Sequence, residues 1–406
     1  ESILAGFSNE FRSGMTTPHK RRILGDEGDH APEHWLWGGP DTSPVDVLLL
    51  CYGSSDQDLA QRVDQLVADL PSRGLEEVHR LDTVTLPEFR EHFGFRDSIG
   101  QPYIAEFDRH SQQQEGAVPL GEFVLGYPNG YGLLTPRPLL APELDRLDLL
   151  APDPEGTDTR DLGLNGSYLV FRQLAQDVPG FWRTQQALAT GSDSLIRDPI
   201  HLAAKMVGRW PSGTSLVAAP HHDVDHVTDK DRFLYHATDA DGARCPLGAH
   251  IRRTNPRDSL EPEPGSEESL AFSNRHRLLR RGRAYGTPFA PSLDPKDMLD
   301  RLDNEDDGDR GLHFICLNGN IGRQFEFVQH TWADNPNFNG LRQETDPIIG
   351  HRNLFGESQD SFRVQHEPLR CKYRPLPEFV TTRGGGYFFL PSRRALHYLF
   401  RNPEQP

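Results

Sequence analysis

Apolar residues recur along this chain at spacings that alternate between strand-like and helix-like. A largely apolar run at 45–52, interrupted by Asp46, predicts a buried strand. Leucine and valine then recur at helical spacing through 56–70, directly after Ser54 and Ser55, which are suitable helix caps. The segment 75–86 predicts a second strand. A strand, a helix and a strand in this order open a ferredoxin-like α+β unit.

The second half of the chain repeats this order. It predicts two strands and two helices, in the sequence strand, helix, strand, helix, at 167–172, 178–188, 312–317 and 323–332. In the last helix, Phe325, Val328 and Trp332 share one face. The fold class is therefore α+β. We expect two ferredoxin-like domains, each an antiparallel sheet with helices, forming a body centred on a β-sandwich.

Segments rich in proline, glycine and charged residues divide the chain. We expect an extended arm that lies on the body, an N-terminal ferredoxin-like domain and a C-terminal ferredoxin-like domain, over 1–44, 45–160 and 161–406. The connection between the two domains lies at 151–163. Two further polar stretches, at 257–269 and 303–310, are predicted to be surface loops.

Composition excludes several classes of partner. The 406 residues include 60 acidic and 43 basic ones, for a net charge of −17, which argues against nucleic acid or an anionic membrane. No apolar run approaches the roughly 20 residues of a membrane helix. The 4 cysteines are far apart and require no oxidising compartment. We expect a cytoplasmic protein, with export by a removed N-terminal signal as the alternative; a homo-oligomer is compatible with the sequence.

One histidine has an unusual local setting. His250 lies in the segment CPLGAHIRRTNPRD at 245–258, where small residues precede it and Arg252, Arg253 and Arg257 follow. A neutral imidazole nitrogen suits iron, and guanidinium groups suit the two propionates of a haem. The alternative for a histidine considered alone is a core or loop residue beside a basic face.

Two other segments accompany this histidine: GFRDSIGQP at 94–102 and LRRGRAYG at 279–286. Together the three segments resemble the signatures of the dye-decolourising peroxidases, a haem family. These signatures are a GxxDG loop, a proximal histidine in an AHIRxxNP setting and an arginine in an RxGxxYG run. The resemblance covers most of the chain from about residue 45 and continues through GLHFIC, QFEFVQ and DPIIG, at 311–316, 324–329 and 346–350.

The resemblance implies an oxidoreductase with haem b, in which His250 is the axial ligand and therefore the metal ligand. The second ring nitrogen of His250 should donate to a carboxylate. Asp346 is the expected acceptor, and Glu326 is a weaker candidate. For Asp346 considered alone, capping of a helix before an apolar segment is an equal alternative.

On the opposite face of the haem, the resemblance makes Asp97 the proton shuttle and Arg280 the stabiliser of developing charge. Arg280, rather than its neighbour Arg281, stands six residues before Gly286, as the family's pattern requires. Ser98 replaces the glycine that follows the aspartate in the family, which puts the conformation of this loop in doubt. Considered alone, Asp97 would be an ordinary Asx-turn residue.

Further residues receive expected roles. Leu312 and Phe314 match a pair that closes the space above the iron, and period-two spacing puts both on one strand face, where plain core packing is the compatible alternative. Arg253 is expected to contact a propionate. Trp332 and Tyr285 are candidate surface relays that carry electrons from bulky reductants. The expected partners are hydrogen peroxide and organic reductants such as dyes and phenols.

Two alternatives to a peroxidase remain at this point. A haem-binding carrier or iron-release protein would need His250 and a pocket, but not the pair Asp97 and Arg280. A ferredoxin-like scaffold that binds another anionic ligand would use the same arginines without haem. A cluster that resembles a metal site, His221, His222, Asp223, Asp225 and His226, lacks regular ligand spacing and is predicted to be a solvated loop.

Overall fold

The computed structural model describes residues 2–107, 116–224, 231–304, 306, 308–353, 358, 360–366 and 369–401. Within these residues the helices are α1 (Ser2–Ala5), α2 (Asn9–Ser13), α3 (Pro18–Leu24), α4 (Asp56–Asp69), α5 (Val178–Thr190), α6 (Pro199–Val207), α7 (His236–Asp239), α8 (His250–Thr254), α9 (Glu267–Asn274), α10 (Pro295–Asp300) and α11 (Arg393–Arg401). The strands are β1 (Leu139–Leu140), β2 (Ala151–Pro152), β3 (Arg160–Asp161), β4 (Ser167–Gln176), β5 (Leu279–Arg280), β6 (Arg283–Gly286), β7 (Arg310–Asn318), β8 (Phe362–Val364), β9 (Cys371–Tyr373) and β10 (Val380–Leu390).

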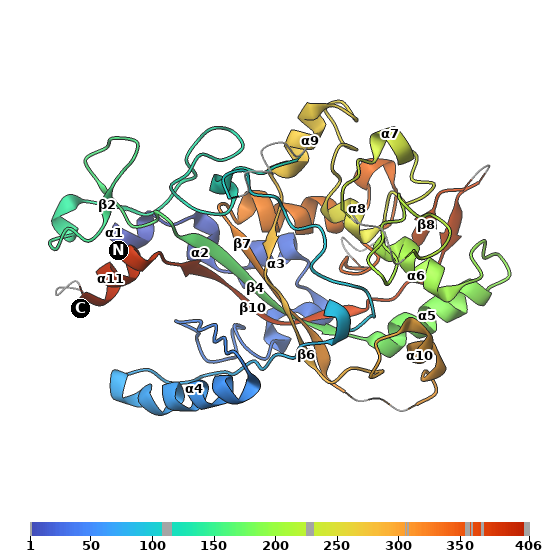
Figure 1. The fold of residues 1–406 in the computed structure, drawn as a ribbon, viewed down its shortest axis with the longest axis horizontal. Helices are drawn as coiled ribbons and strands as arrows, with labels where there is room; N and C mark the ends of the chain where they lie inside the picture. Colours follow the sequence, from blue (N-terminus) through green and yellow to red (C-terminus); the bar gives the residue numbers. More distant parts are fainter. Residues whose placement is uncertain are drawn as a thin grey trace.

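A five-stranded antiparallel sheet organises the second half of the chain. Its order is β10-β4-β7-β5, and β6 also pairs with β7. Figure 1 shows β4, β7 and β10 as long neighbouring ribbons through the middle of the molecule. Helix α5 follows β4, and a helix with π-type hydrogen bonds, η8 (Gly322–Glu326) and η9 (Val328–Ala333), lies between β7 and β10. The strand order places the last strand beside the first, which is the ferredoxin-like arrangement.

The expected α+β class is confirmed, and so are the strands and helices predicted in this half. Successive side chains of β4 point to opposite sides of the sheet, and all of those at 167–173 are buried. Both faces of β4 are therefore covered. Tyr168 and Val170 pack in one apolar cluster with the N-terminal segment, whereas Leu169 and Phe171 pack in another. A central strand covered on both faces explains the uninterrupted apolar run at 168–171.

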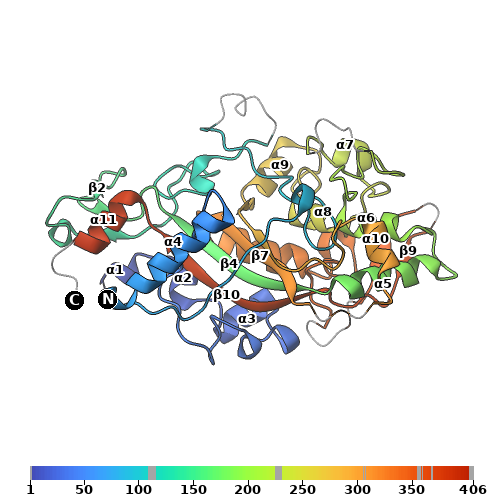
Figure 2. The same cartoon turned by 60° about the horizontal axis from the view of Figure 1, so that its bottom comes forward.

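The N-terminal segment lies on the body, as expected, but it is not extended. It forms the short helices α1 to α3, and Met15, Leu24 and Trp35 are buried in the core against the sheet. Trp37 forms an isolated bridge with Gly384 of β10. Figures 1 and 2 both place α1 and α11 at the same end of the molecule. The capping residues Ser8 and Gly14, which bound α2, explain why a segment rich in glycine and polar residues still forms helical turns.

The two strands predicted at 45–52 and 75–86 are absent from the structure. Only the intervening helix α4 forms, and the hydroxyl of Ser55 caps it by accepting a hydrogen bond from the amide of Asp58. Leu49 and Tyr52 are more than half exposed. An apolar run becomes a strand only when a neighbouring strand supplies hydrogen bonds. Within these two segments the structure shows one isolated bridge, between Val84 and Ala284.

The described helices include none that is long and apolar enough to cross a membrane. The division into domains at 44 and 160 stays a prediction.

The loop at 94–102 is held by aromatic packing at its start. Phe93 and Phe95 pack in the largest apolar cluster, where Phe93 lies against Phe181, with ring centroids 4.6 Å apart, and Phe95 stacks on Trp182 at 6.4 Å. These contacts anchor the loop to α5 of the second half.

The correction at 45–52 can be tested with two identical substitutions. Leu49→Ala should change the free energy of unfolding by less than about 0.5 kcal/mol, because the side chain is largely exposed. Leu202→Ala should cost about 2–5 kcal/mol, because Leu202 of α6 is fully buried. Urea unfolding measures both values. A cost for Leu49→Ala equal to that for Leu202→Ala would show that 45–52 is a buried strand after all.

Candidate active site

His250 is the first residue of α8, and its side chain is paired with a buried carboxylate. Nδ1 of His250 lies 3.0 Å from Oδ2 and 3.2 Å from Oδ1 of Asp346. Oδ1 of Asp346 also accepts hydrogen bonds from the amides of Ile348 and Ile349. Burial alone would raise the pKa of Asp346, but the charge and hydrogen bond of His250 and the amide of Ile349 lower it below its usual value. Asp346 is therefore an anion that accepts the Nδ1 proton.

This pairing determines what His250 can bind. In the neutral imidazole with its proton on Nδ1, Nε2 carries a free lone pair. Nε2 makes no hydrogen bond within the described part of the chain, and 27% of the His250 side chain is exposed. An imidazole held by a buried carboxylate, with its other nitrogen available, is the usual form of a metal-ligating histidine.

A second pair brings together two residues that are 183 positions apart. Nη1 of Arg280, at the end of β5, lies 3.5 Å from Oδ1 of Asp97. Nη2 of Arg280 donates to the carbonyl of Ile99 at 2.7 Å, so the guanidinium also holds the loop that carries Asp97. About one third of each side chain in the pair is exposed. The pair therefore presents an acid and a cation together at an accessible position.

Glu91 positions the start of the same loop. Its carboxylate accepts hydrogen bonds from the amides of Phe93 and Phe95, at 2.8 and 3.0 Å, and from the side chain of Gln176 at the end of β4. Burial raises the pKa of Glu91 to about 7, although these hydrogen bonds act in the opposite direction. The sequence analysis missed this residue, because nothing in the local motif shows that Gln176 would lie beside it.

Ser98 adopts a backbone conformation that favours glycine. Its φ is +64°, in the left-handed region that glycine enters freely and other residues enter at a cost. Gly100, two residues later, also has a positive φ, of +75°. The loop therefore keeps a glycine-like turn at position 98, although the residue there has a side chain.

Leu312 and Phe314 lie on one face of β7, and both are half-buried. Cys316 shares that face, and it stands directly opposite Arg280 in the β5–β7 pairing. Residues directly opposite in an antiparallel pair project to the same side of the sheet. The structure thus places two apolar side chains on the sheet face to which Arg280 belongs.

Three arginines from separate segments converge near the loop at 94–102, and the sequence analysis did not predict this convergence. Arg209 and Arg257 both donate to Oδ1 of Asp231, at 2.6 and 2.5 Å, and Arg277 donates to the carbonyl of Gly100 at 2.8 Å. Burial lowers the pKa of Arg277 to about 10, and the charge of Arg257 acts in the same direction. The density of arginine was visible in the sequence, but not which arginines converge.

Arg253 has a structural role. It is fully buried, and its guanidinium donates to the carbonyls of Trp332, Asn335 and Glu344. It therefore ties α8 to the π-helical segment and to the residues before Asp346. This role differs from the expected propionate contact, which stays a prediction.

The two candidate relays are not on the surface, contrary to expectation. Trp332 is buried, with its ring centroid 5.2 Å from that of His276. Tyr285 is also buried, and it stacks on His313 at 4.6 Å. Both are covered because each faces the core from a regular element, η9 or β6. Electron transfer through either residue stays a prediction.

The histidine-rich segment after residue 220 shows no metal site in its described part. His221, His222 and Asp223 are exposed, and Asp223 accepts hydrogen bonds from Ser212. Asp225 and His226 lie outside the described residues. Among the residues that the structure does describe, no group of three or more acidic, histidine or cysteine side chains could hold a metal ion.

Known proteins provide an independent comparison. No family model matches the chain. The chain is 33% identical over 320 residues to a multifunctional dye peroxidase of an Amycolatopsis strain, covering 76% of this chain and 61% of that protein. It is 30% identical over 398 residues to Peroxidase 2 of Mycetinis scorodonius, covering 91% of this chain and 68% of the relative.

Solved structures agree. A DyP-type peroxidase of Anabaena sp. superposes with a TM-score of 0.71 at 27% identity, covering 98% of this chain and 76% of that one. The Amycolatopsis enzyme DyP2 superposes with a TM-score of 0.73 at 27% identity, covering 96% and 78%. The chain belongs to the dye-decolourising peroxidase family. The resemblance carried by the three sequence signatures is thereby confirmed. The chain spans 61% of the length of the Amycolatopsis relative that it matches.

Ser98 provides a test of the loop that departs from the family pattern. Ser98→Gly should remove the cost of a left-handed conformation, about 1 kcal/mol, against a similar loss from the greater freedom of glycine when unfolded. We therefore expect the free energy of unfolding, measured by thermal denaturation, to change by less than about 1 kcal/mol in Ser98→Gly. Ser98→Val should lower it by more, because a β-branched residue is strained there. Equal stability of the two variants would contradict a positive φ at this position.

Proposed function

We propose that this protein is a haem peroxidase that reduces hydrogen peroxide and oxidises bulky organic reductants such as dyes and phenols. One observation carries the proposal. The chain holds both a carboxylate-paired histidine with a free Nε2 and, on separate elements, an acid–cation pair, Asp97 and Arg280. A haem carrier needs the first pair only. Family membership supports the same conclusion.

The side chains that are present fit haem b. Nε2 of His250 offers one neutral nitrogen donor, and Leu312 and Phe314 offer apolar surface. Arg209 and Arg257 both pair with Asp231, and Arg277 donates to the carbonyl of Gly100; three guanidinium groups against one carboxylate leave an excess of positive charge that suits the two propionates. These arginines are better candidates for the propionates than Arg253, whose guanidinium already donates to backbone carbonyls. Haem, when bound, would supply the redox chemistry that cleaves the O–O bond.

His250 and Asp346 would act from one side of the cofactor. The hydrogen bond from Nδ1 to the buried carboxylate makes the imidazole a stronger electron donor. It also fixes the tautomer and the orientation of the ring, so that Nε2 is the nitrogen offered to iron. Because two backbone amides also bind Oδ1 of Asp346, the carboxylate stays ionised and keeps its position.

Asp97 and Arg280 would act on the peroxide. The carboxylate of Asp97 can accept a proton from one peroxide oxygen and return it to the other, so that the departing oxygen leaves as water. The guanidinium of Arg280 is permanently charged and can donate to that departing oxygen while negative charge develops on it. The direct contact between the two side chains places the acid and the cation next to each other.

The reductant is proposed by class only. One family structure is a complex with 2,6-dimethoxyphenol. This complex supports phenols as one class of reductant for the present protein. Dyes are supported by the names of the relatives, among them the dye peroxidase of Amycolatopsis.

Adjacent arginines provide the test of this function. In stopped-flow mixing of the haem-loaded protein with hydrogen peroxide, Arg280→Leu should slow the reaction by about 100- to 1,000-fold, because a preorganised donor to the developing charge is lost. Arg281→Leu should react like the wild type, because Arg281 is exposed and its guanidinium, among the described residues, donates only to the neighbouring carbonyl of Arg280.

Two results would contradict the proposal. A larger loss in Arg281→Leu than in Arg280→Leu would show that the assigned arginine is wrong. A wild-type protein that binds haem in stoichiometric amount but does not react rapidly with peroxide would instead be a haem carrier.

A further inference from the structure

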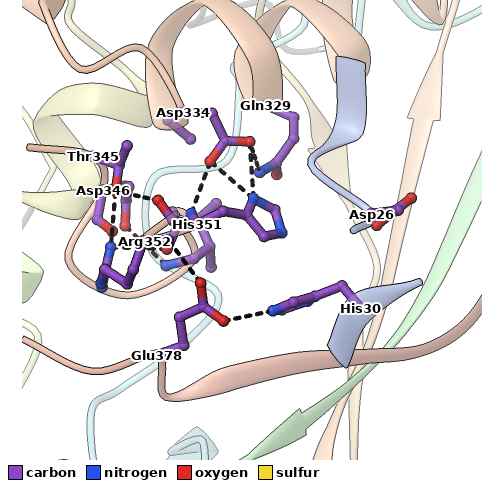
Figure 3. Close-up of polar contacts among 12 residues, drawn as sticks. Asp26, His30, Gln329, Asp334, Thr345, Asp346, His351, Arg352 and Glu378 are labelled. Atoms are coloured by element: carbon purple, nitrogen blue, oxygen red, sulfur yellow. Dashed lines mark hydrogen bonds and ion pairs between the residues drawn. The ribbon is translucent and has the colours of Figure 1, made fainter. Parts of the chain in front are cut away.

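A buried guanidinium binds the loop whose carboxylate, that of Asp346, pairs with His250. Arg352 is only 4% exposed. Its Nη1 donates to the hydroxyl of Thr345 and to the carbonyls of Asp346 and Gly350, at 2.9, 2.8 and 2.8 Å, and its Nη2 donates to the carbonyl of Pro347 at 2.8 Å. Figure 3 shows Arg352 beside Thr345 and Asp346. Among the described residues, no carboxylate forms an ion pair with this guanidinium.

Burying a guanidinium without a counter-ion costs free energy of folding unless other groups satisfy its donors. A buried cation needs either a counter-ion or a full set of hydrogen-bond acceptors. Burial lowers the pKa of Arg352 to about 10, although the charges of Glu378, Asp346 and Asp334 act in the opposite direction. Backbone carbonyls have replaced the counter-ion, and four of the six acceptors of Arg352 belong to the single loop at 345–350.

That loop turns tightly around the carboxylate. A Cβ atom added to Gly350 would lie 2.5 Å from the amide nitrogen of Asp346 and 2.6 Å from its carbonyl oxygen. The amide of Asp346 itself donates to the carbonyl of Ala333 at 2.8 Å. The backbone of Asp346 is thus held at both its amide and its carbonyl; Arg352 and the amide of Gly350, at 2.8 and 3.0 Å, both donate to the carbonyl.

The surroundings fix Arg352 in turn. The amide of Arg352 donates to Oε1 of Glu378 at 2.7 Å, and Oε2 of Glu378 lies 3.0 Å from Nε2 of His30 in the N-terminal segment. The neighbouring His351 is paired with Asp334, with its Nδ1 3.0 Å from Oδ1. Figure 3 shows these groups as one continuous polar network.

We propose that Arg352 is a positioning residue for the haem ligand: it holds the loop at 345–350 so that the carboxylate of Asp346 meets Nδ1 of His250. This inference rests on the proposed role of His250 as axial ligand. Arg253 supports the same geometry from the other side, because it lies on the helix of His250 and donates to the carbonyl of Glu344 at 2.7 Å. Two guanidinium groups therefore flank the residue that accepts the proton of His250.

If Arg352 has this role, its loss should change the bond between iron and His250 rather than the reaction with peroxide. A weaker hydrogen bond from His250 to Asp346 makes the imidazole a poorer electron donor, which weakens the bond between iron and histidine. Resonance Raman spectroscopy of the haem-loaded ferrous protein measures the stretching frequency of this bond. Haem affinity, measured by transfer to an acceptor protein, provides a second readout that does not depend on turnover.

Arg352→Met removes the donors and keeps most of the side-chain volume. It should lower the iron–histidine frequency in the same direction as Asp346→Asn and weaken haem binding by about 10- to 100-fold, the range expected for partners of a metal-ligating histidine. Arg310→Met is the matched control. Arg310 is equally buried and donates to Thr287 and Asp306, so its loss should destabilise the fold but leave the frequency unchanged.

Gly350→Ala tests the same geometry with Arg352 intact, should Arg352→Met fail to fold. Its added Cβ must displace the backbone of Asp346, so the frequency should fall. A folded Arg352→Met, or failing that a folded Gly350→Ala, with wild-type frequency and haem affinity would overturn the proposal, provided that Asp346→Asn shifts both. If neither Asp346→Asn nor His250→Ala changes the frequency, the assignment of His250 as the ligand fails instead.

Discussion

A hydrogen bond between His250 and a buried carboxylate is the interaction on which the rest of the site depends. Asp346 is fully buried, and an ion in that position is tolerated only when it is satisfied by partners. His250 and two backbone amides provide those partners. The same bond decides which nitrogen of the imidazole carries the proton, and so leaves the other nitrogen available for the metal-ligand role proposed for His250.

Much of the surrounding structure maintains this bond. Arg253 and Arg352 are buried arginines whose guanidinium groups bind the carbonyls of Glu344 and of Asp346 itself. In the second part of the site, packing of Phe93 and Phe95 on α5 fixes the loop that carries Asp97, and Arg280 joins that loop to β5. Thus buried charge organises the side of His250, whereas aromatic packing organises the side of Asp97.

Sequence reasoning succeeded where the information is local. The pairs His250–Asp346 and Asp97–Arg280 could be named because each residue lies in a short motif, and the structure brings the members of each pair together. The strand predicted at 45–52 failed because a strand requires a partner elsewhere, which local pattern does not reveal. The convergence of Arg209, Arg257 and Arg277 was invisible for the same reason, since three distant segments contribute to it.

Haem titration of the wild type and of His250→Ala tests the central claim most directly. The account predicts that the wild type binds one equivalent of haem with the visible spectrum of an imidazole-ligated iron. His250→Ala should lose that spectrum, and added imidazole should restore it, because the ligand would then be supplied from solution. An unchanged spectrum and an unchanged haem affinity in His250→Ala would show that another residue binds the iron, and would contradict the account.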